Sequence, residues 1–494
     1  MEIFCFIILL SLCVSMLLVK SLNTVPLPPG PLHLPFITAI LWLRTSLSEL
    51  HQILRNIHSK HGPIFTLHFW FGPSIFIADS SIAHQALVQK GVVFADRPKA
   101  LSNTAHQLNI SSSSYGHTWR RLRRNLVSQM LHPSRFSCFS GTRKRVLDDL
   151  LNRLQTEAEK NHSSVKVREH FEHAMFSLLV FMCFGEAVEE NKIREIKQVQ
   201  RSLALGLNRF GVLNFLPKVV TRLLFRKRWL ELLDLRNAQK DAFSELIKAR
   251  KSVLVLNGGF ICYVDTLLKL RLQEESGELD EGEVVALCSE FLTAGTDTTS
   301  TALEWVMANV VKHADVQQKV VEEIGEVVGD REEKEVKEED LKRLLYLKGV
   351  ILEGLRCHPP SHLLVPHAVR EDVVLSGYMV PRNGSVNFMV AEMGWDGRVW
   401  EDPMAFKPER FLGSEFEAFD IVGSKEIRMM PFGAGRRACP AYHLAMHHLE
   451  FFVANLVWSF QWKASNGDSV DLSWKQEFSM VMKHPLEAQI YFRF

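Results

Sequence analysis

The segment from Phe432 to Cys439, FGAGRRAC, constrains the fold and the chemistry of this chain more than any other feature. It presents one cysteine on a glycine-containing, doubly basic loop, directly before a predicted helix. The helix is indicated by an apolar stripe with three- or four-residue spacing: Ala445, Leu449, Phe452, Val453 and Leu456. A thiolate in this position is stabilised by the helix dipole and by nearby guanidinium groups. The loop therefore suits axial ligation of haem iron, with Arg437 placed for a haem propionate and Phe432 near the porphyrin.

Two other kinds of site fit parts of the same loop. Residues 433–438 match the dinucleotide fingerprint GxGxxA, with residues 427–430 as its preceding strand. Fewer than 60 residues follow the fingerprint, which is too few for a doubly wound sheet. A zinc site would need a second nearby cysteine, whereas the nearest one, Cys357, lies far upstream. The haem interpretation is therefore favoured, and a nucleotide-binding dehydrogenase stays an alternative.

The cysteine segment resembles FxxGxRxCxG, the signature of the cytochrome P-450 family of haem-thiolate monooxygenases. Phe432, Gly435, Arg437 and Cys439 match it, and Ala441 stands where the family usually has glycine. The resemblance implies haem b as the cofactor, with the Cys439 thiolate as the metal ligand and the other three matching residues around the haem. It also implies the cytochrome P-450 fold, mainly α with a small β region, in a single catalytic domain behind an N-terminal membrane anchor.

The pattern of the whole chain agrees with a mainly helical fold. Its 58 basic and 56 acidic side chains nearly balance, so nucleic acid is not an expected partner. Periodicity predicts helices near 117–131, 143–159, 168–184, 190–206, 229–252, 283–312 and 314–328. Strands are predicted as a hairpin over 64–78, at 373–380 and 385–390, and as a C-terminal hairpin over 478–494. Many helices with a few scattered strands predict one mostly α body.

The N-terminus predicts a membrane anchor. Ile3 to Val19 are uncharged and mostly apolar, close to the roughly 17–25 residues of a membrane-spanning helix. The negative charge of Glu2 argues against a signal peptide, whose first residues are positively charged. By the positive-inside rule, Lys20 predicts that the body of the protein lies in the cytosol. We expect an anchor at 1–25, a proline-rich hinge at 26–35 and the catalytic domain at 36–494. The resemblance to plant microsomal members implies a single-pass protein of the endoplasmic reticulum membrane, in contact with membrane lipid.

A long helix with a polar centre is the second chemical feature. Asp280 and Glu283 suit its start, and it extends to about Lys312, yet its centre reads AGTDTTST over 294–301. One interpretation is two helices, the first ending at Gly295 and the next beginning near residue 297. The other is a single, locally widened helix.

The polar centre of this helix resembles the family motif (A/G)Gx(D/E)T(T/S) at every position. The resemblance implies that Asp297 and Thr298 are catalytic, forming an acid–alcohol pair that relays protons to dioxygen at the haem. Thr298 would turn its hydroxyl into the gap left by a broken backbone hydrogen bond, while residues 294–295 clear space over the haem. This pair favours a true monooxygenase over the isomerase-like or dehydratase-like members of the family.

Further motifs predict the scaffold around the haem. Glu353 and Arg356 by themselves indicate only a surface ion pair at i, i+3. Their resemblance to the family's ExxR element, with Arg410 in a PERF element, implies a buried structural triad. Family patterns imply three other cofactor-binding residues. Trp119 and Arg123 match the pattern WxxxR, and His367 matches the pattern P(H/R).

The resemblance also implies a substrate and a partner. Segments 101–114, 361–365 and 480–482, with Phe291 and Ala294, are largely apolar or hydroxylic and suit a lipophilic small molecule. Electrons are expected from NADPH through a membrane-bound flavoprotein reductase that docks near basic residues such as 120 and 124. The alternatives are a family member that acts as an isomerase or dehydratase without dioxygen, and a non-catalytic haem-binding protein.

Overall fold

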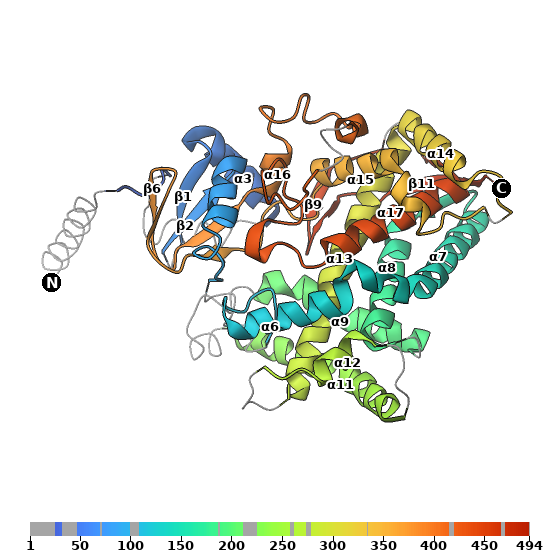
Figure 1. Ribbon diagram of the computed structural model, residues 1–494, viewed down its shortest axis with the longest axis horizontal. Helices are drawn as coiled ribbons and strands as arrows, with labels where there is room; N and C mark the ends of the chain where they lie inside the picture. The colour runs from blue at the N-terminus through green and yellow to red at the C-terminus, as the bar shows by residue number, and fades with distance from the viewer. Residues whose placement is uncertain are drawn as a thin grey trace, which may run out of the picture.

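Helices surround one long central helix in the computed structural model, with β1, β2 and β6 toward the end of the body nearer the N-terminus and β11 at the opposite end, beside the C-terminus (Figure 1). The structure describes residues 25–31, 47–69, 72–98, 108–185, 188–210, 225–256, 261–272, 278–332, 334–413, 419–465 and 470–493.

Each of the seven helices predicted from periodicity is present within one or a few residues of its expected limits. The α-helices are α3 (Leu47–His61), α4 (Ser80–His84), α6 (His117–Leu126), α7 (Ser140–Lys160), α8 (Val167–Phe184), α9 (Glu190–Phe210), α11 (Arg226–Leu256), α12 (Tyr263–Leu268), α13 (Glu281–Lys312), α14 (Ala314–Val328), α15 (Leu345–Cys357), α16 (Val390–Gly394) and α17 (Tyr442–Ser459). Short π-helical turns are η1 (Gln85–Gln89) and η2 (Val127–Leu131), and 3₁₀ turns are η3 (Pro133–Phe139), η5 (Asp340–Arg343), η6 (Pro408–Phe411) and η7 (Gly435–Arg437).

The strands form four small sheets. They are β1 (Ile64–Phe69), β2 (Gly72–Ile77), β3 (Ser164–Lys166), β4 (His367–Ala368), β5 (Val373–Leu375), β6 (Tyr378–Val380), β7 (Ser385–Phe388), β8 (Phe460–Ala464), β9 (Trp474–Gln476), β10 (Met480–Met482) and β11 (Glu487–Phe492). The strand orders are β1-β2-β7-β4, β3-β11-β8, β10-β9 and β5-β6. The predicted hairpin over 64–78 is confirmed, because β1 and β2 are antiparallel with Ile64 opposite Ile77.

The predicted C-terminal hairpin is wrong. β10 pairs with β9, whereas β11 lies between β3 and β8 in another sheet. Pro485 lies in the connection between β10 and β11 and has no N–H to donate to a ladder. The chain therefore passes from one sheet to the next instead of folding back on itself.

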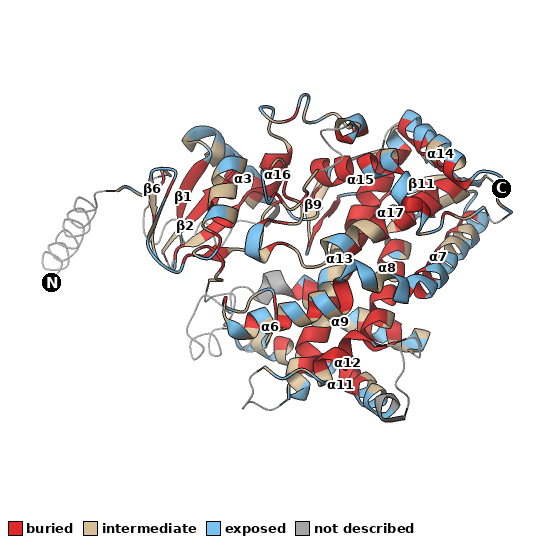
Figure 2. Ribbon diagram, in the orientation of Figure 1, coloured by how far each residue is buried: buried red, intermediate tan, exposed pale blue. Residues whose placement is uncertain are grey.

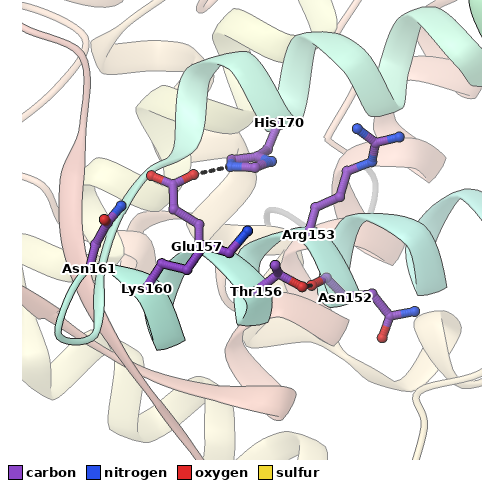
Figure 3. A pocket seen from close by; sticks show the side chains of 7 residues that line it. All are labelled: Asn152, Arg153, Thr156, Glu157, Lys160, Asn161 and His170. Carbon is purple, nitrogen blue, oxygen red and sulfur yellow. Dashed lines mark hydrogen bonds and ion pairs between the residues drawn. The ribbon is translucent and has the colours of Figure 1, made fainter.

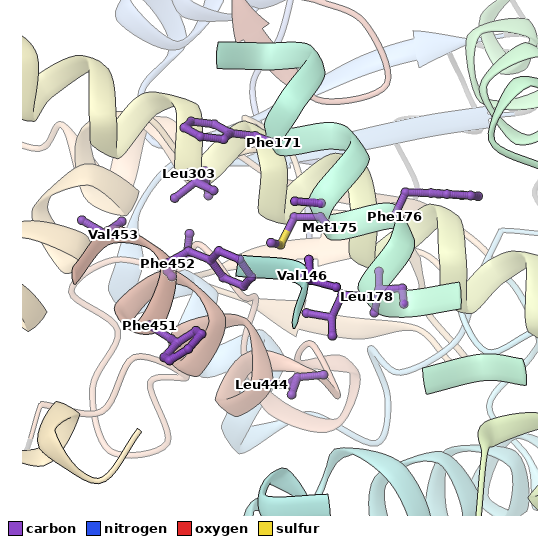
Figure 4. Packing of buried hydrophobic residues seen from close by; sticks show 14 of the residues in the cluster. Val146, Phe171, Met175, Phe176, Leu178, Leu303, Leu444, Phe451, Phe452 and Val453 are labelled. Atoms are coloured by element: carbon purple, nitrogen blue, oxygen red, sulfur yellow. The ribbon is translucent and has the colours of Figure 1, made fainter. Parts of the chain in front are cut away.

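The largest apolar core lies where α8, α13 and α17 pack together (Figure 4). Phe171 and Met175 of α8, Leu303 of α13 and Phe452 of α17 are at most 2% exposed. Figure 2 shows this burial extending along α15 and α17, with exposed faces on α7 and α14. Each such side chain contributes roughly 1.5–3 kcal/mol relative to remaining in water, so the core fixes α13 firmly beside α17.

The central helix α13 is continuous, so the two-helix interpretation is wrong. A capping box starts it, in which Asp280 accepts from Glu283 N at 2.8 Å and Glu283 accepts from Asp280 N at 3.0 Å. Its polar centre is accommodated by hydroxyls that bond to the preceding turn, as Thr298 Oγ1 does to Ala294 O at 2.7 Å. A Cβ on Gly295 would lie 2.7 Å from Leu179 Cδ1. The missing side chain at Gly295 therefore lets α8 pack closely against α13. The sequence predicts a different role for this glycine, which is to clear space over the haem.

Residues 1–24 of the predicted anchor at 1–25 lie outside the described residues, as do residues 32–35 of the predicted hinge. The described part of the hinge is attached to the fold, because Pro26 O accepts from Met379 N at 2.9 Å and Pro29 O accepts from Thr66 N at 2.8 Å. Its role as a spacer stays a prediction. Among the described helices, none has the length and apolar character needed to cross a membrane.

Candidate haem-thiolate site

The cysteine loop is a tight turn packed against η1. Cys439 N donates to Phe432 O at 2.7 Å, which closes the loop at its two ends. Gly435 has a φ of +67°, and a Cβ there would lie 1.9 Å from Leu87 O. Only glycine fits this left-handed position so close to another backbone. The strand required by the dinucleotide interpretation is absent from the described residues before the loop, since 427–430 are not paired with any strand.

The charge that favours a thiolate at Cys439 comes from a different element than the sequence suggested. Burial raises the pKa of the Cys439 thiol, while the Ala441 N–H and the Arg123 guanidinium oppose that rise. Arg123, on α6, donates from Nη2 to Ala438 O at 2.6 Å, next to the cysteine. We expected guanidinium groups of the loop itself in this role, but Arg437 points elsewhere.

Arg437 is held by backbone carbonyls on the far side of the loop. It donates from Nε to Ala95 O at 2.7 Å and from Nη2 to Ser113 O at 2.6 Å, and its guanidinium lies 4.4 Å from the Trp119 ring centroid. Trp119 Nε1 donates to Ile110 O at 3.0 Å. Arg437 and Trp119 are therefore brought together and orientated by neutral groups, without a carboxylate bonded to the guanidinium.

A further arginine that sequence analysis missed completes this cation cluster. Arg97 is 8% exposed and donates from Nη1 to Val365 O at 2.8 Å and to Pro366 O at 3.0 Å. Burial, then repulsion by Arg437, lowers the pKa of Arg97 to about 9. Burial also lowers the pKa of Arg437 to about 10. The available signal in the sequence was its position, directly before Pro98 and just after the apolar run 92–95 and Asp96.

His367 lies next to the cluster but is uncharged. Its Nδ1 donates to Phe94 O at 2.7 Å, and burial, followed by repulsion from Arg97, lowers its pKa to about 3. We expected a basic residue here, and the structure gives instead a neutral imidazole with one fixed N–H. His367 can therefore contribute only a neutral hydrogen bond to an anionic group.

The residues at this site fit haem. The cluster defined by Arg97, Arg123 and Arg437 places three guanidinium groups close enough to repel one another, with Asp96 acting on Arg97 and Arg437 and Glu290 acting on Arg437. Burying like charges together is costly unless an anion balances them. The two propionates of a bound haem would supply that balance, next to a cysteine that can ligate iron. The roles of the single residues toward haem stay predictions.

Asp297, on the other reactive element, has the properties of a proton-transfer group. Burial and the nearby Glu172 raise its pKa to about 6, against the opposing charges of Arg201, Arg168 and Lys197. A cavity of about 20 Å³ lies beside it, and its lining includes the polar side chains of Arg168, Glu172, Arg201 and Thr301. That volume is enough for about one water molecule. Asp297 and Thr298 thus adjoin each other on α13, and α13 packs against α17, the helix that follows the cysteine loop.

The ExxR elements form a fully buried network, so the surface interpretation of this pair is wrong. Arg356 donates to Glu353 through Nε at 2.6 Å and Nη2 at 2.7 Å, and both side chains are 0% exposed. Arg410 Nε lies 3.2 Å from the same carboxylate. The remaining donors of Arg356 reach Gly394 O and Pro403 O, both at 2.7 Å. The network therefore fixes the stretch 394–410, which leads toward the cysteine loop.

A surface hollow of about 400 Å³ between α7 and α8 lies apart from these elements (Figure 3). Its polar side chains include Arg153 and Lys160, and Glu157 pairs with His170 across it. None of the predicted site residues lines it. The chemistry of the chain therefore belongs to the interior beside α13.

A mainly helical fold that holds a partly buried cysteine loop, a cation cluster beside it and a long central helix is that of a haem-thiolate protein. The Cytochrome P450 family model matches residues 28–492, and the chain belongs to the cytochrome P450 family. The family uses haem b with a cysteine thiolate as the axial ligand, and the chain is a cytochrome P450 monooxygenase.

Curated plant relatives match almost the whole chain. Cytochrome P450 89A9 of Arabidopsis thaliana is 48% identical, covering 98% of this chain and 98% of its own length. Isoflavone 3'-hydroxylase of Medicago truncatula is 32% identical over 94% and 92%, and geraniol 8-hydroxylase of Catharanthus roseus is 30% identical over 95% and 94%. A zebrafish cytochrome P450 structure with progesterone has a TM-score of 0.73 at 22% identity, covering 90% of this chain and 99% of that one, and shares the fold.

Proposed function

We propose that this monooxygenase inserts one atom of dioxygen into a lipophilic small molecule, using electrons from NADPH delivered by a flavoprotein reductase in the endoplasmic reticulum membrane. The observation that carries the proposal is the combination of a thiol on a glycine turn, a cluster of three guanidinium groups that repel one another beside it, and a carboxyl of raised pKa on α13. Groups with strongly shifted pKa values cluster at functional sites, so these three features together support a catalytic role.

In this proposal Cys439 ligates the iron, and Phe432 and Gly435 shape the loop around it. Arg97, Arg123 and Arg437 balance the propionates, while Trp119 and His367 add neutral N–H groups. Bound haem supplies the centre at which dioxygen is activated. Asp297 takes protons from water in the adjoining cavity, and Thr298 passes them on from its hydroxyl.

The reductase is proposed to dock on the outer face of α6. Arg120 and Arg124 are exposed there, on the same helix that turns Trp119 and Arg123 inward. A basic surface one helix thickness from the cation cluster suits an acidic electron donor. The predicted anchor at 1–25 would keep both proteins at one membrane, with the catalytic domain facing the cytosol.

The substrate is proposed to be a small lipophilic plant compound. The names of two relatives identify geraniol and an isoflavone as compounds that those proteins hydroxylate. The segments predicted to contact substrate lie partly within the described residues, and 480–482 is bonded to α13, since Trp305 Nε1 donates to Met480 O at 2.8 Å.

Reconstitution of the full chain with a plant reductase tests the proposal. Incubation with NADPH, ¹⁸O₂ and a tissue lipid extract is expected to yield products heavier by one labelled oxygen atom. Products that form equally without NADPH and carry no label would indicate the isomerase or dehydratase alternative. A normal haem-thiolate spectrum with no NADPH-dependent product from any extract would indicate a haem-binding protein.

A further inference from the structure

A network of charged side chains surrounds Asp297 where α8, α9 and α13 meet. We call it the Glu172 network. Besides Asp297 and Glu304 of α13, its members are Arg168 and Glu172 of α8, Lys197 and Arg201 of α9, and Glu477, which follows β9.

Glu172 holds the cations of this network. Its side chain is buried, and its carboxylate accepts from Arg168 Nε at 3.1 Å and from Arg201 Nη1 at 2.7 Å. Lys197 Nζ lies 3.9 Å from the same carboxylate. One buried carboxylate is therefore within ion-pair distance of three cations.

The Asp297 carboxylate has no such partner. Among the described residues, none donates a hydrogen bond to this carboxylate or lies within ion-pair distance of it, although the three cations are near enough to affect its pKa. The carboxylate instead borders the cavity of about 20 Å³. If Glu172 were removed, the cations could pair with Asp297, because an opposite charge within about 4–6 Å favours the ionised carboxylate.

The other contacts of the network leave Asp297 unpaired as well. Arg168 Nη2 donates to Glu477 at 2.7 Å, and Glu304 accepts from Leu486 N at 3.0 Å. The side chain of Arg201 is 48% exposed, whereas Glu172 is buried beneath it. The network therefore extends from bulk water to the cavity beside Asp297.

We propose that Glu172 is a positioning residue for proton transfer: by holding the three cations, it leaves the Asp297 carboxyl unpaired and able to carry a proton from the cavity. The pKa of Asp297, which burial and then Glu172 raise to about 6, agrees with this role. The inference rests on the proposed function, in which Asp297 is the proton donor.

Infrared difference spectroscopy of the holoprotein, without reductase, tests the proposal by following the protonated carboxyl band of Asp297 as the pH is raised. Loss of the band in Asp297→Asn identifies it and separates it from that of Glu304, whose pKa burial raises to about 7. The wild-type midpoint is expected near pH 6. In Glu172→Gln it should fall by at least about one pH unit, which leaves roughly tenfold less protonated Asp297 at pH 7. Glu172→Asp keeps the charge and is expected to recover most of the shift.

Arg201→Gln makes the opposite change. Removing one cation is expected to move the midpoint upward, so Glu172→Gln and Arg201→Gln should shift it in opposite directions. The control is Glu169→Gln, which removes the same charge from an exposed residue of α8 that does not line the cavity, and it should leave the midpoint unchanged.

A midpoint that Glu172→Gln leaves unchanged, or that both substitutions move in the same direction, would overturn the proposal. The haem-thiolate spectrum of each variant reports its folding. If Glu172→Gln lacks that spectrum, Arg201→Gln decides, since a midpoint that does not rise in it would also overturn the proposal.

The pH profile of product formation separates this inference from the proposed function. A midpoint that shifts as expected while the profile stays unchanged would reject Asp297 as the proton donor, and the positioning role with it. A wild-type profile with its inflection near pH 6 and a midpoint unmoved by Glu172→Gln would reject the role of Glu172 alone.

Discussion

Asp297 combines a functional property with a cost in stability. Because its pKa is raised in the folded protein from the ordinary 3.8 to about 6, the folded state binds its proton more tightly than the unfolded state does. The free energy of unfolding contributed by this group therefore falls as the pH rises from about 4 to about 6, and stays low above that range. A carboxyl kept under such conditions indicates a role other than packing.

Asp297→Asn is expected to slow product formation and to raise the midpoint of thermal unfolding at pH 7. In the wild type, the rate of product formation should fall as the pH rises through about 6, since the protonated carboxyl is the donor. The variant should lack that inflection. A pH profile unchanged by the substitution would contradict the proton-transfer role, and stopped-flow turnover with scanning calorimetry provides both readouts.

Gly435 sets the geometry of the cysteine loop by its left-handed conformation and its contact with Leu87. Gly435→Ala is expected to cost at least ~1–3 kcal/mol from the backbone alone and to prevent most haem incorporation. Gly397→Ala is the matched control, because a Cβ there meets no atom within 4 Å and the residue is exposed. Haem content per polypeptide measures the effect, and equal haem content in the two variants would show that the loop tolerates a side chain.

At the scale of elements, periodicity predicted the helices well because each buries one apolar face against a neighbour. It could not show contacts between segments far apart in sequence. The placement of Gly295 against Leu179 depends on how α8 crosses α13, and the cluster of Arg97 with Arg437 depends on how distant loops meet. The prediction of a C-terminal hairpin is wrong for the same reason, because the alternating pattern within a strand does not show which strand pairs with it.

For the network that joins α15 and η6, the residues alone predict a surface ion pair, whereas the family resemblance predicts the buried triad that the structure contains. Glu353→Gln is expected to cost about 3–5 kcal/mol, because it leaves the Arg356 guanidinium buried without its counter-ion. Arg398→Ala removes an exposed guanidinium that pairs with Asp396 and with Asp79, and each of these pairs should contribute less than about 1 kcal/mol. Denaturant unfolding of both variants gives the comparison, and similar small losses would mean that the buried pair is not a structural anchor.

At the scale of the whole molecule, the account places electron entry on one face and substrate on another. Arg124→Glu is expected to raise the KM for the reductase by roughly fivefold at low salt, the effect of about 1 kcal/mol, with less effect at high salt. Lys60→Glu makes the same charge change on an exposed residue of α3 and should leave this KM unchanged. Equal effects of the two variants would mean that α6 is not the docking face.

The central claim is that Cys439 is the ligand through which this chain holds haem iron. Its most direct test is the spectrum of the ferrous carbon monoxide complex of the purified wild type beside Cys439→Ala, with Cys138→Ala, at an exposed cysteine, as control. We expect the thiolate-type spectrum in the wild type and in Cys138→Ala, and its loss in Cys439→Ala. A thiolate-type spectrum that persists in Cys439→Ala would contradict the account.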